Sequence, residues 1–298
     1  MDTNTHKNTP RTESKSASSA SKAAPKNTNA LAPNTQKAFP ALTIAGSDCS
    51  GGAGIQADLK TFGAHNVFGM SVVLSVVAEN TARVISSYDI PRDSIDAQFE
   101  AIFEDIPPLA CKIGMLGSAE IIECVAQNLA RYKPKNVVID PVMFAKNGFA
   151  LMPESIREHF KNTMLAFADV LTPNIPEAQA LCGVEIKDTE SMKTAARALF
   201  DMGAKSVLLK GGHKEENCDD VFYDGREFHT LCAQKIQTKN THGTGCTLSS
   251  AIAANLALGK GMLDSITLAK EYVFNAILHS FALGKGNGPT NHFWRNAL

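Results

Sequence analysis

The residues best suited to chemistry lie in one short segment, residues 238–250, with the sequence Thr-Lys-Asn-Thr-His-Gly-Thr-Gly-Cys-Thr-Leu-Ser-Ser. Gly243 and Gly245 flank Thr244, and Cys246 begins a run of small residues that predicts a helix to about residue 258. Glycine permits tight turns and leaves its N–H groups uncovered, and a helix N-terminus adds unpaired N–H groups and a positive dipole end. The segment therefore predicts a site that binds an anion without a cationic side chain.

Cys246 would lie at the mouth of this anion site. A cysteine in apolar surroundings is usually a small core residue. At a helix N-terminus, however, the pKa of a thiol falls and the thiolate is favoured. Cys246 is therefore a candidate general base or covalent nucleophile, while His242, four residues before it, either orients the thiol or is a solvated loop histidine. The spacing alone leaves these alternatives open.

Three further segments place polar residues directly after a short apolar run. Asp140 follows residues 136–139, and an acid there suits a magnesium-bound water or a bridging cation, or else a turn or helix cap. Glu177 lies in the first turn of a predicted helix, where it either serves a site or complements the helix dipole. Lys210 and two glycines follow residues 206–209 and indicate close backbone approach to a nucleotide.

A glycine-rich loop also occurs early in the chain, at residues 46–54, with the sequence Gly-Ser-Asp-Cys-Ser-Gly-Gly-Ala-Gly. It matches neither the GxGxxG dinucleotide pattern nor the GxxxxGK[ST] phosphate loop, so a flexible connection is the alternative to a binding loop. Asp58 follows one turn into the next helix, on the rim shared by Ser47 and Asp48. Carboxylates in that position suit the recognition of a polar small molecule.

These segments need a scaffold that brings them to one edge. Short apolar runs alternate with amphipathic helical patterns, which favours a mainly parallel sheet covered by helices on both faces, with ligands at the carboxyl ends of the strands. We expect strands at residues 41–45, 70–78, 84–90, 110–113, 136–139, 169–171 and 206–209, and a hairpin around Asp224-Gly225. We expect helices after residue 54 and at residues 92–105, 118–131, 153–163, 176–182, 189–202, 245–258 and 262–283.

The composition narrows the class of protein. The chain has 298 residues, 44% hydrophobic and 20% charged, with a net charge of −1, so no basic surface indicates a nucleic acid or membrane partner. No run of 18 apolar residues and no signal-peptide pattern occurs, and the seven cysteines form no CxxC pair, which favours a reduced, cytoplasmic protein. Residues 1–38 are rich in Ser, Thr, Lys, Asn, Ala and Pro, and we expect a disordered tail there before a single domain at 39–298.

Taken in order, these motifs resemble the ribokinase superfamily and, within it, the hydroxymethylpyrimidine/phosphomethylpyrimidine kinases of thiamine biosynthesis. The resemblance runs from about Pro40 to the C-terminus. Each motif is weak by itself, but their joint order is specific. The motifs are residues 41–62, 112–116, 138–143, 171–178, 209–213 and 240–246.

The resemblance implies a ribokinase-like three-layer α/β/α fold and a kinase that uses ATP and Mg²⁺. Such an enzyme phosphorylates 4-amino-5-hydroxymethyl-2-methylpyrimidine and then converts the monophosphate to the diphosphate. The partner expected is therefore a small-molecule pyrimidine, with no nucleic acid and no membrane, and a homodimer is left open.

The resemblance also implies roles for particular residues. The pyrimidine pocket would contain Gly46, Ala53, Asp58, Val77, Glu79, Met115, Val142 and Cys246. The carboxylates for magnesium and phosphate, acting mostly through water, would be Asp140 and Glu177. The ATP-binding residues would be Lys210, Thr238 and Thr244. The catalytic groups would be the amides of Gly243 and Gly245 and the proton acceptor Cys246.

Two positions distinguish this chain within the resemblance. Most of the superfamily has aspartate at the position of Cys246, and cysteine is typical of the pyrimidine and some pyridoxal kinases. Glu79 stands where these pyrimidine kinases commonly have glutamine on the aminopyrimidine edge. Glutamine offers a donor and an acceptor, whereas ionised glutamate offers acceptors only. Glu79 either pairs with the exocyclic amine and a protonated ring nitrogen or indicates a shifted substrate preference.

Three other functions compete with this interpretation. A pyridoxine or pyridoxal kinase would share the fold, the cysteine and ATP. A cysteine acyltransferase would use Cys246 as a covalent nucleophile. A nucleotide-binding regulator would keep the site without catalysis.

Overall fold

The computed structural model describes residues 37–145, 148–212 and 219–295. The chain divides into two compact units, residues 1–37 and residues 38–298, and the second unit contains every helix and strand given below. The predicted disordered tail, residues 1–38, lies outside the described residues except for its last two positions. No helix of the described residues is both long enough and apolar enough to span a membrane.

The described residues form one nine-stranded sheet with the order β3-β2-β1-β4-β5-β6-β7-β8-β9. The strands from β2 through β7 in this order are parallel to one another, and β3, β8 and β9 run antiparallel to their neighbours. The prediction of a mainly parallel sheet is confirmed, as is the hairpin formed by β8 and β9. The strands are β1 (Pro40–Asp48), β2 (Phe68–Glu79), β3 (Val84–Asp89), β4 (Ala110–Ile113), β5 (Val137–Ile139), β6 (Val170–Leu171), β7 (Val207–Leu209), β8 (Asp220–Tyr223) and β9 (Phe228–Leu231).

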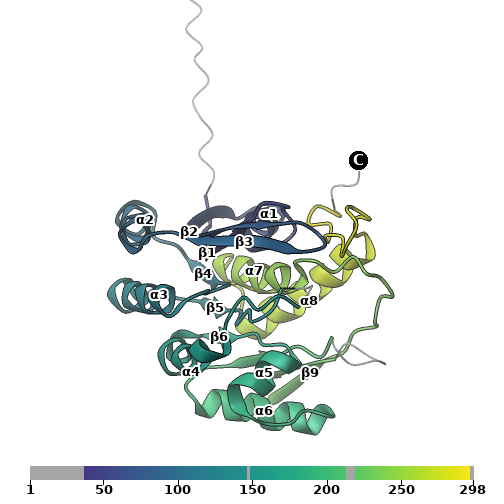
Figure 1. Cartoon of the computed structure of the whole chain (residues 1–298). Helices are drawn as coiled ribbons and strands as arrows, with labels where there is room; N and C mark the ends of the chain where they lie inside the picture. Colours follow the sequence, from purple (N-terminus) through teal and green to yellow (C-terminus); the bar gives the residue numbers. More distant parts are fainter. Residues whose placement is uncertain (1–36, 146–147, 213–218, 296–298) are drawn as a thin grey trace, which may run out of the picture. The chain divides into compact units, whose positions relative to one another are not determined.

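Helices cover both faces of the sheet and create two hydrophobic cores (Figure 1). Because successive side chains of a strand point to opposite faces, Leu42 and Ile44 of β1 enter one core and Ala41 enters the other. The first core is covered by α2 (Arg92–Asp105), α3 (Ala119–Tyr132), α4 (Glu154–Met164), α5 (Ile175–Cys182) and α6 (Thr189–Asp201), with a 3₁₀ helix, η1 (Leu165–Phe167). The second core is covered by α1 (Gly54–Ala64), α7 (Thr244–Ala257) and α8 (Met262–Leu278).

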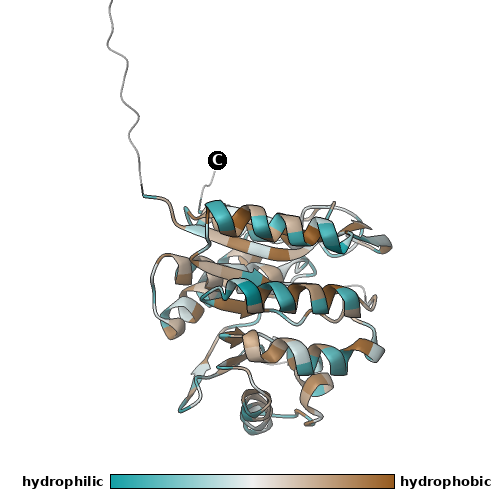
Figure 2. Cartoon of the chain, turned by 90° about the vertical axis from the view of Figure 1, so that its left-hand side faces the viewer, coloured by the Kyte–Doolittle hydropathy of each residue, from teal (hydrophilic) through white to brown (hydrophobic). Residues whose placement is uncertain are grey.

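The outer helices are amphipathic, as their spacing of apolar residues predicts. In α3, Ile121, Val125 and Leu129 recur at intervals of four residues and are all buried. Figure 2 shows α2, α3 and α4 stacked with hydrophilic residues on the side that faces the viewer. By contrast, α7 is buried from Thr247 to Ala257, which explains its run of small residues. The fold is therefore the three-layer α/β/α arrangement expected from the sequence.

The predicted end of the last helix at residue 283 is wrong, because α8 ends at Leu278. The chain then turns back, and Gly284 adopts a φ of +76° that other residues rarely adopt. The segment 284–290 binds two distant loops: Asn287 N–H donates to Thr81 O at 3.0 Å, and His242 N–H donates to Gly288 O at 3.0 Å. The end of the chain therefore connects the loop after β2 with the loop before α7.

Strand order fixes where the polar loops meet. The chain passes from β1 to β2 on one side and later to β4 on the other side of β1. Such a reversal opens a crevice at the carboxyl ends of the strands. The loops after β1, β4 and β5 end at this edge, together with the N-terminus of α7.

Candidate active site

The two glycine-rich loops pack directly against each other. Gly243 is the N-cap of α7 with a φ of +77°, and a Cβ there would lie 1.7 Å from the carbonyl oxygen of Gly52. A Cβ on Gly52 would lie 2.3 Å from Cδ2 of His242. Only residues without side chains allow this approach. The loop 46–54 therefore packs against the start of α7, and its part in binding a ligand stays a prediction.

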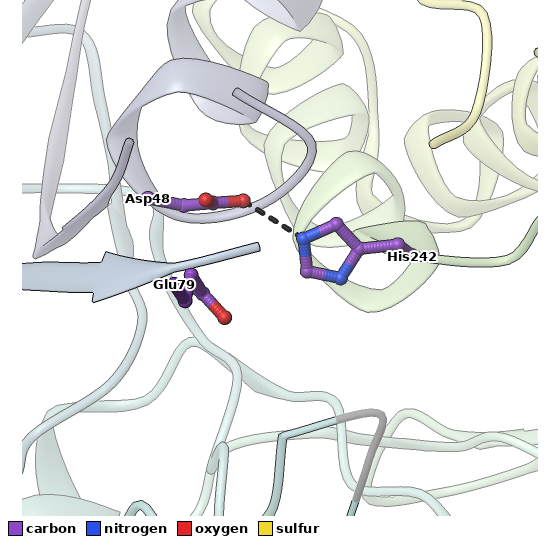
Figure 3. A group of neighbouring side chains, drawn as sticks. All are labelled: Asp48, Glu79 and His242. Carbon is purple, nitrogen blue, oxygen red and sulfur yellow. Dashed lines mark hydrogen bonds and ion pairs between the residues drawn. The ribbon is translucent and has the colours of Figure 1, made fainter. Parts of the chain in front are cut away.

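Asp48 holds the first loop together and anchors the second. Its Oδ1 accepts the Ser50 N–H at 2.7 Å, and its Oδ2 accepts the N–H groups of Gly52 at 3.0 Å and Ala53 at 2.7 Å. Nε2 of His242 lies 2.8 Å from the same Oδ2 (Figure 3) and must be a donor if the carboxylate is ionised. Burial raises the pKa of Asp48, but these hydrogen bonds outweigh burial and hold the pKa well below its usual range.

Both sequence-based alternatives for His242 are therefore wrong. The side chain is buried rather than solvated, and its Nε2 contacts Asp48 rather than the thiol of Cys246. His242 and Asp48 are 194 positions apart, so no local spacing in the sequence indicates their contact. His242 orients the glycine loop and not the cysteine.

A pocket opens between the first loop, the end of β2 and the N-terminus of α7. It contains seven of the eight residues expected to bind the pyrimidine, and the exception is Asp58. A Cβ on Gly46 would lie 2.5 Å from Ser75 Oγ and 2.8 Å from Met115 Cε, so a larger residue there would displace these side chains at the pocket wall. The complete lining is Ala45, Gly46, Ser47, Ala53, Gly54, Val77, Glu79, Lys112, Met115, Val142, Leu151 and Cys246.

Asp58 lies behind this pocket in a buried polar network. Its carboxylate accepts hydrogen bonds from Thr43 Oγ1 at 2.6 Å, Ser250 Oγ at 2.6 Å and Lys112 Nζ at 2.8 Å. Asp58 and Lys112 are both fully buried. Burial lowers the pKa of Lys112, but the charges of Asp58, Cys246 and Asp140 and the hydrogen bond to Asp58 together raise it by more, so the ammonium stays charged. Asp58 therefore fixes a cation at the pocket wall instead of forming part of that wall.

Lys112 is the residue that sequence reasoning missed. It lies in β4, where an apolar side chain is expected, and although it begins the motif 112–116, only its charge indicates a role for the side chain itself. A lysine in the middle of a buried strand indicates a buried carboxylate partner. The sequence cannot say which carboxylate, because Asp58 is 54 positions away.

Cys246 lies in the first turn of α7 and is half-buried. Burial raises the pKa of its thiol to about 11, although the charge of Lys112 and a hydrogen bond from the Gly54 backbone oppose the rise. The expectation that the helix N-terminus favours the thiolate is therefore wrong for the ligand-free protein. Burial is the largest contribution to this raised pKa. The charges of nearby Asp58 and Asp140 add to it, because they disfavour a further negative charge on the thiol.

Near Gly245 of α7, the buried Asp140 and the partly buried Lys210 form an ion pair with 2.7 Å between Oδ1 and Nζ. Thr172 Oγ1 donates to the same Oδ1 at 3.2 Å. A Cβ on Gly245 would lie 3.2 Å from Asp140 Oδ2 and 3.5 Å from Lys210 Nζ. Burial lowers the pKa of Lys210, but Asp140 and Glu177 raise it by more. The structure thus brings an acid, a cation and the anion-binding helix end together.

Glu177 lies at the helix start that was one of the two alternatives for it, and its part in a site stays a prediction. It forms a capping box with Asn174, in which the Asn174 N–H donates to Glu177 Oε2 at 2.8 Å and the Glu177 N–H donates to Asn174 Oδ1 at 2.9 Å. It is also only 4% exposed, and burial raises its pKa to about 7, with Lys210 opposing and Asp140 adding to the rise. A helix cap on the surface would not have this environment.

The two threonines expected to bind ATP have local hydrogen bonds. Thr238 Oγ1 accepts the Asn240 N–H at 3.1 Å, and Thr244 Oγ1 donates to Thr241 O at 2.8 Å. No hydrogen bond of the described residues joins either hydroxyl to Lys210. Their part in binding ATP stays a prediction.

Glu79 is the last residue of β2 and lies at the pocket edge beside Asp48 and His242 (Figure 3). One potential ligand atom from each of these three residues lies within 4.8 Å of the others. Burial, together with the charge of Asp48, raises the pKa of Glu79 to about 7, and His242 opposes the rise. Its backbone carbonyl accepts a hydrogen bond from the Cys49 thiol at 3.1 Å.

The fold is ribokinase-like, the fold of a class of small-molecule phosphotransferases, and its small pocket meets the N-terminus of α7. The chain belongs to the phosphomethylpyrimidine kinase family, whose sequence pattern matches residues 48–291. A relative from Haemophilus influenzae, described as hydroxymethylpyrimidine/phosphomethylpyrimidine kinase, is 48% identical over 258 residues, which cover 85% of this chain and 96% of the relative.

Solved structures agree with this assignment. The phosphomethylpyrimidine kinase of Clostridium difficile is 43% identical with a TM-score of 0.73, covering 80% of this chain and 99% of that chain. The pyridoxal kinase of Bacillus subtilis, solved as an ADP complex, is 41% identical with a TM-score of 0.82, covering 87% of this chain and 99% of that chain. The family assignment replaces the acyltransferase alternative with a phosphotransferase.

Proposed function

We propose that this protein transfers the γ-phosphoryl group of ATP to the hydroxymethyl group of 4-amino-5-hydroxymethyl-2-methylpyrimidine and then phosphorylates the monophosphate to the diphosphate. The product would be the pyrimidine precursor of thiamine diphosphate. One observation carries the proposal: seven residues expected to bind the pyrimidine line one pocket, and that pocket ends at the N-terminus of α7 beside Asp140 and Lys210. The name of the Haemophilus relative and the ADP complex of the Bacillus neighbour support it.

The reaction needs little covalent chemistry from the protein. The hydroxymethyl oxygen forms a bond to the γ-phosphorus, the bond from that phosphorus to the bridging oxygen breaks, and ADP leaves with the electron pair. Catalysis then depends on positioning and on stabilising negative charge. The N–H groups of Gly245 and Cys246 lie in the first turn of α7 and would bind the transferred group. Lys210 would bind a phosphate oxygen as a point charge.

Cys246 would take the proton of the substrate hydroxyl. It lines the pocket, so a bound hydroxymethyl group could reach its sulfur. Because its pKa is about 11 in the ligand-free protein, only a small thiolate fraction exists near neutral pH. Lys112 and the Gly54 N–H are the groups that favour this fraction.

Asp140 and Glu177 fit a magnesium ion that keeps most of its water. They supply hard oxygen atoms, and Mg²⁺ is usually bound by one or two carboxylates together with substrate phosphates. Among the residues that the structure describes, Asp140 Oδ2 accepts one hydrogen bond, from Ser249 Oγ at 3.5 Å, while Oδ1 accepts those of Lys210 and Thr172. When bound, the ion would neutralise phosphate charge. The carboxylates would hold its water ligands.

The test is turnover with magnesium and ATP, with the monophosphate and diphosphate followed separately. Both products should appear with release of ADP, and the absence of either removes that half of the proposal. A nucleotide-binding regulator would release no ADP in response to the pyrimidine.

Pyridoxal phosphorylation is the second candidate activity, because the Bacillus pyridoxal kinase is so similar in structure. Parallel assays with pyridoxal and the pyrimidine separate the two. Higher kcat/KM for pyridoxal would reverse our choice. A homodimer and a cytoplasmic location stay predictions.

A further inference from the structure

Asp48, Glu79 and His242 converge at the pocket edge, and their atoms are close enough to surround a cation (Figure 3). The hydrogen bonds argue against a metal site. Asp48 Oδ2 already lies within hydrogen-bond distance of three nitrogen donors, and the Nε2 that would bind a metal is one of them. Asp48 and His242 therefore form a closed pair. The group that remains available to a ligand is the carboxyl of Glu79.

The Glu79 carboxyl is held in the pocket without a partner of its own. Within residues 37–145, 148–212 and 219–295, no hydrogen bond reaches its carboxyl oxygens, although its backbone is bonded to Cys49. Asp48 beside it is 1% exposed and ionised, and a second negative charge so close is unfavourable. The titratable or charged groups around it are Asp48 and Cys49 of the first loop, His242 before α7, Lys112 and Cys246 of the pocket lining, Arg83 before β3, and Lys285 of the segment that contacts Thr81.

An aminopyrimidine presents two groups on one edge, an exocyclic amine that donates and a ring nitrogen that accepts. An ionised carboxylate can bind only the amine, because it has no proton to donate. A protonated carboxyl offers one donor and one acceptor and so matches both groups. A carboxylate that faces a protonated ring nitrogen is the equivalent arrangement, in which the shared proton lies on the ring instead of on the carboxyl.

We propose that Glu79 makes substrate recognition proton-linked, so that the aminopyrimidine binds together with one proton shared between this carboxyl and the ring nitrogen. The inference rests on the proposed function, since it takes the aminopyrimidine as the substrate. Glu79 would then select rings that present a donor and an acceptor side by side over rings that lack this pair.

The direction of the pH effect follows from the environment of the free carboxyl. Its pKa is raised to about 7, so well below pH 7 the carboxyl already carries the proton and its titration no longer changes the affinity. Above pH 7 the proton must be taken up on binding, and affinity should fall about tenfold per pH unit until the pKa of the complex is reached. Asp48 stays ionised across this range because its pKa lies well below the usual value.

The experiment is calorimetric titration of the full chain with the hydroxymethylpyrimidine, without ATP or magnesium, between pH 6 and pH 9. Two buffers of different ionisation enthalpy at each pH report proton uptake directly. Wild type should take up close to one proton at pH 8.5, with a dissociation constant about tenfold higher than at pH 7.5. Glu79→Gln should bind with no such uptake and no such fall.

Glu79→Gln is the matched control because it keeps the size of the side chain and removes its titration, while His242, Cys49 and the ring nitrogen of the substrate remain. Equal proton uptake in both proteins would overturn the proposal, and so would a wild-type affinity that does not change with pH. Absence of pyrimidine binding at every pH in both proteins would reject the proposed function as well. Binding and turnover without proton uptake would reject the proton linkage alone.

Discussion

The carboxylate of Asp48 and the imidazole of His242 lie 2.8 Å apart, although 194 positions separate them in the chain. This contact joins the loop after β1 to the loop before α7. Each loop supplies glycines that the other requires for close packing. The phosphate end and the pyrimidine end of the proposed site are therefore held in register by one buried pair.

Replacement of Asp48 by Asn should loosen both loops. One Asn oxygen cannot satisfy four nitrogen donors as a charged carboxylate does, so the free energy of unfolding at pH 7 should fall by about 1–3 kcal/mol. Because the folded pKa of Asp48 is depressed, this stabilisation is present above the unfolded value of 3.8 and is lost as the pH falls below it. Urea unfolding at pH 7 and pH 3 checks this, since an equal difference at both pH values would contradict it.

Replacement of Gly243 by Ala should distort the anion site. The new Cβ would approach Gly52 O at 1.7 Å, and the φ of +77° would itself add strain of about 1–3 kcal/mol. Turnover should fall by at least about tenfold, because the first turn of α7 must move. Gly63→Ala in α1 is the matched control, since a Cβ there meets no atom within 4 Å. Similar losses in the two variants would show that the effect is not specific to the loop contact.

Cys246→Ala should lower kcat by roughly two to four powers of ten if the residue is the proton acceptor. Pyrimidine affinity should change much less, because the hydroxymethyl proton is transferred only during the reaction. Steady-state kinetics and ligand titration together separate the two effects. Cys232→Ala, which changes an exposed cysteine, should leave both unchanged. A loss confined to KM in the Cys246 variant would argue for a packing role.

The thiol of Cys246 should also react slowly with iodoacetamide near neutral pH. With a pKa of about 11, its alkylation rate should rise about tenfold per pH unit between pH 7 and pH 10. Peptide mass mapping over time identifies the modified residue, and Cys246→Ser provides the blank. Rapid alkylation that levels off near pH 7 would show that the thiolate is already favoured without ligands.

Asp140 and Lys210 allow a double-mutant test. Lys210→Met alone leaves a buried carboxylate unpaired and should destabilise the fold by about 3–5 kcal/mol. Adding Asp140→Asn removes that charge, so the double variant should regain part of the stability. Turnover should stay low in both because the phosphate-binding groups are gone. Recovery of activity together with stability would mean that the pair is only structural.

Much of this architecture follows from the sequence. Apolar periodicity predicts most strands and helices within about two residues, apart from the ends of β1 and α8, because α3 and its neighbours each need one apolar face. The glycines and the acids that follow the strands are predicted to meet at one edge of the sheet, since the carboxyl ends of parallel strands lie together. What the sequence does not contain is the pairing of distant charges. Asp58 with Lys112 and Asp48 with His242 depend on how the loops pack.

Tertiary packing explains the remaining predictions from the sequence that were wrong. The position of Cys246 at a helix N-terminus is local and predicts a lowered pKa, but the layers around it are tertiary and raise it. Asp58 appears accessible from its place one turn into α1, yet Thr43 and Ser250 enclose it from β1 and α7. The end of α8 at Leu278 is likewise set by what the following segment contacts.

That following segment has a consequence for how the protein is made. Asn287 and Gly288 are synthesised after the two loops that they hold in place, the loop at Thr81 and the loop at His242. Domains generally begin to fold while translation proceeds. Here the sheet and its helices can assemble on the ribosome, but the pocket edge cannot close until residue 288 has emerged. A nascent chain therefore cannot complete its substrate pocket until the segment 284–290 has emerged from the ribosome.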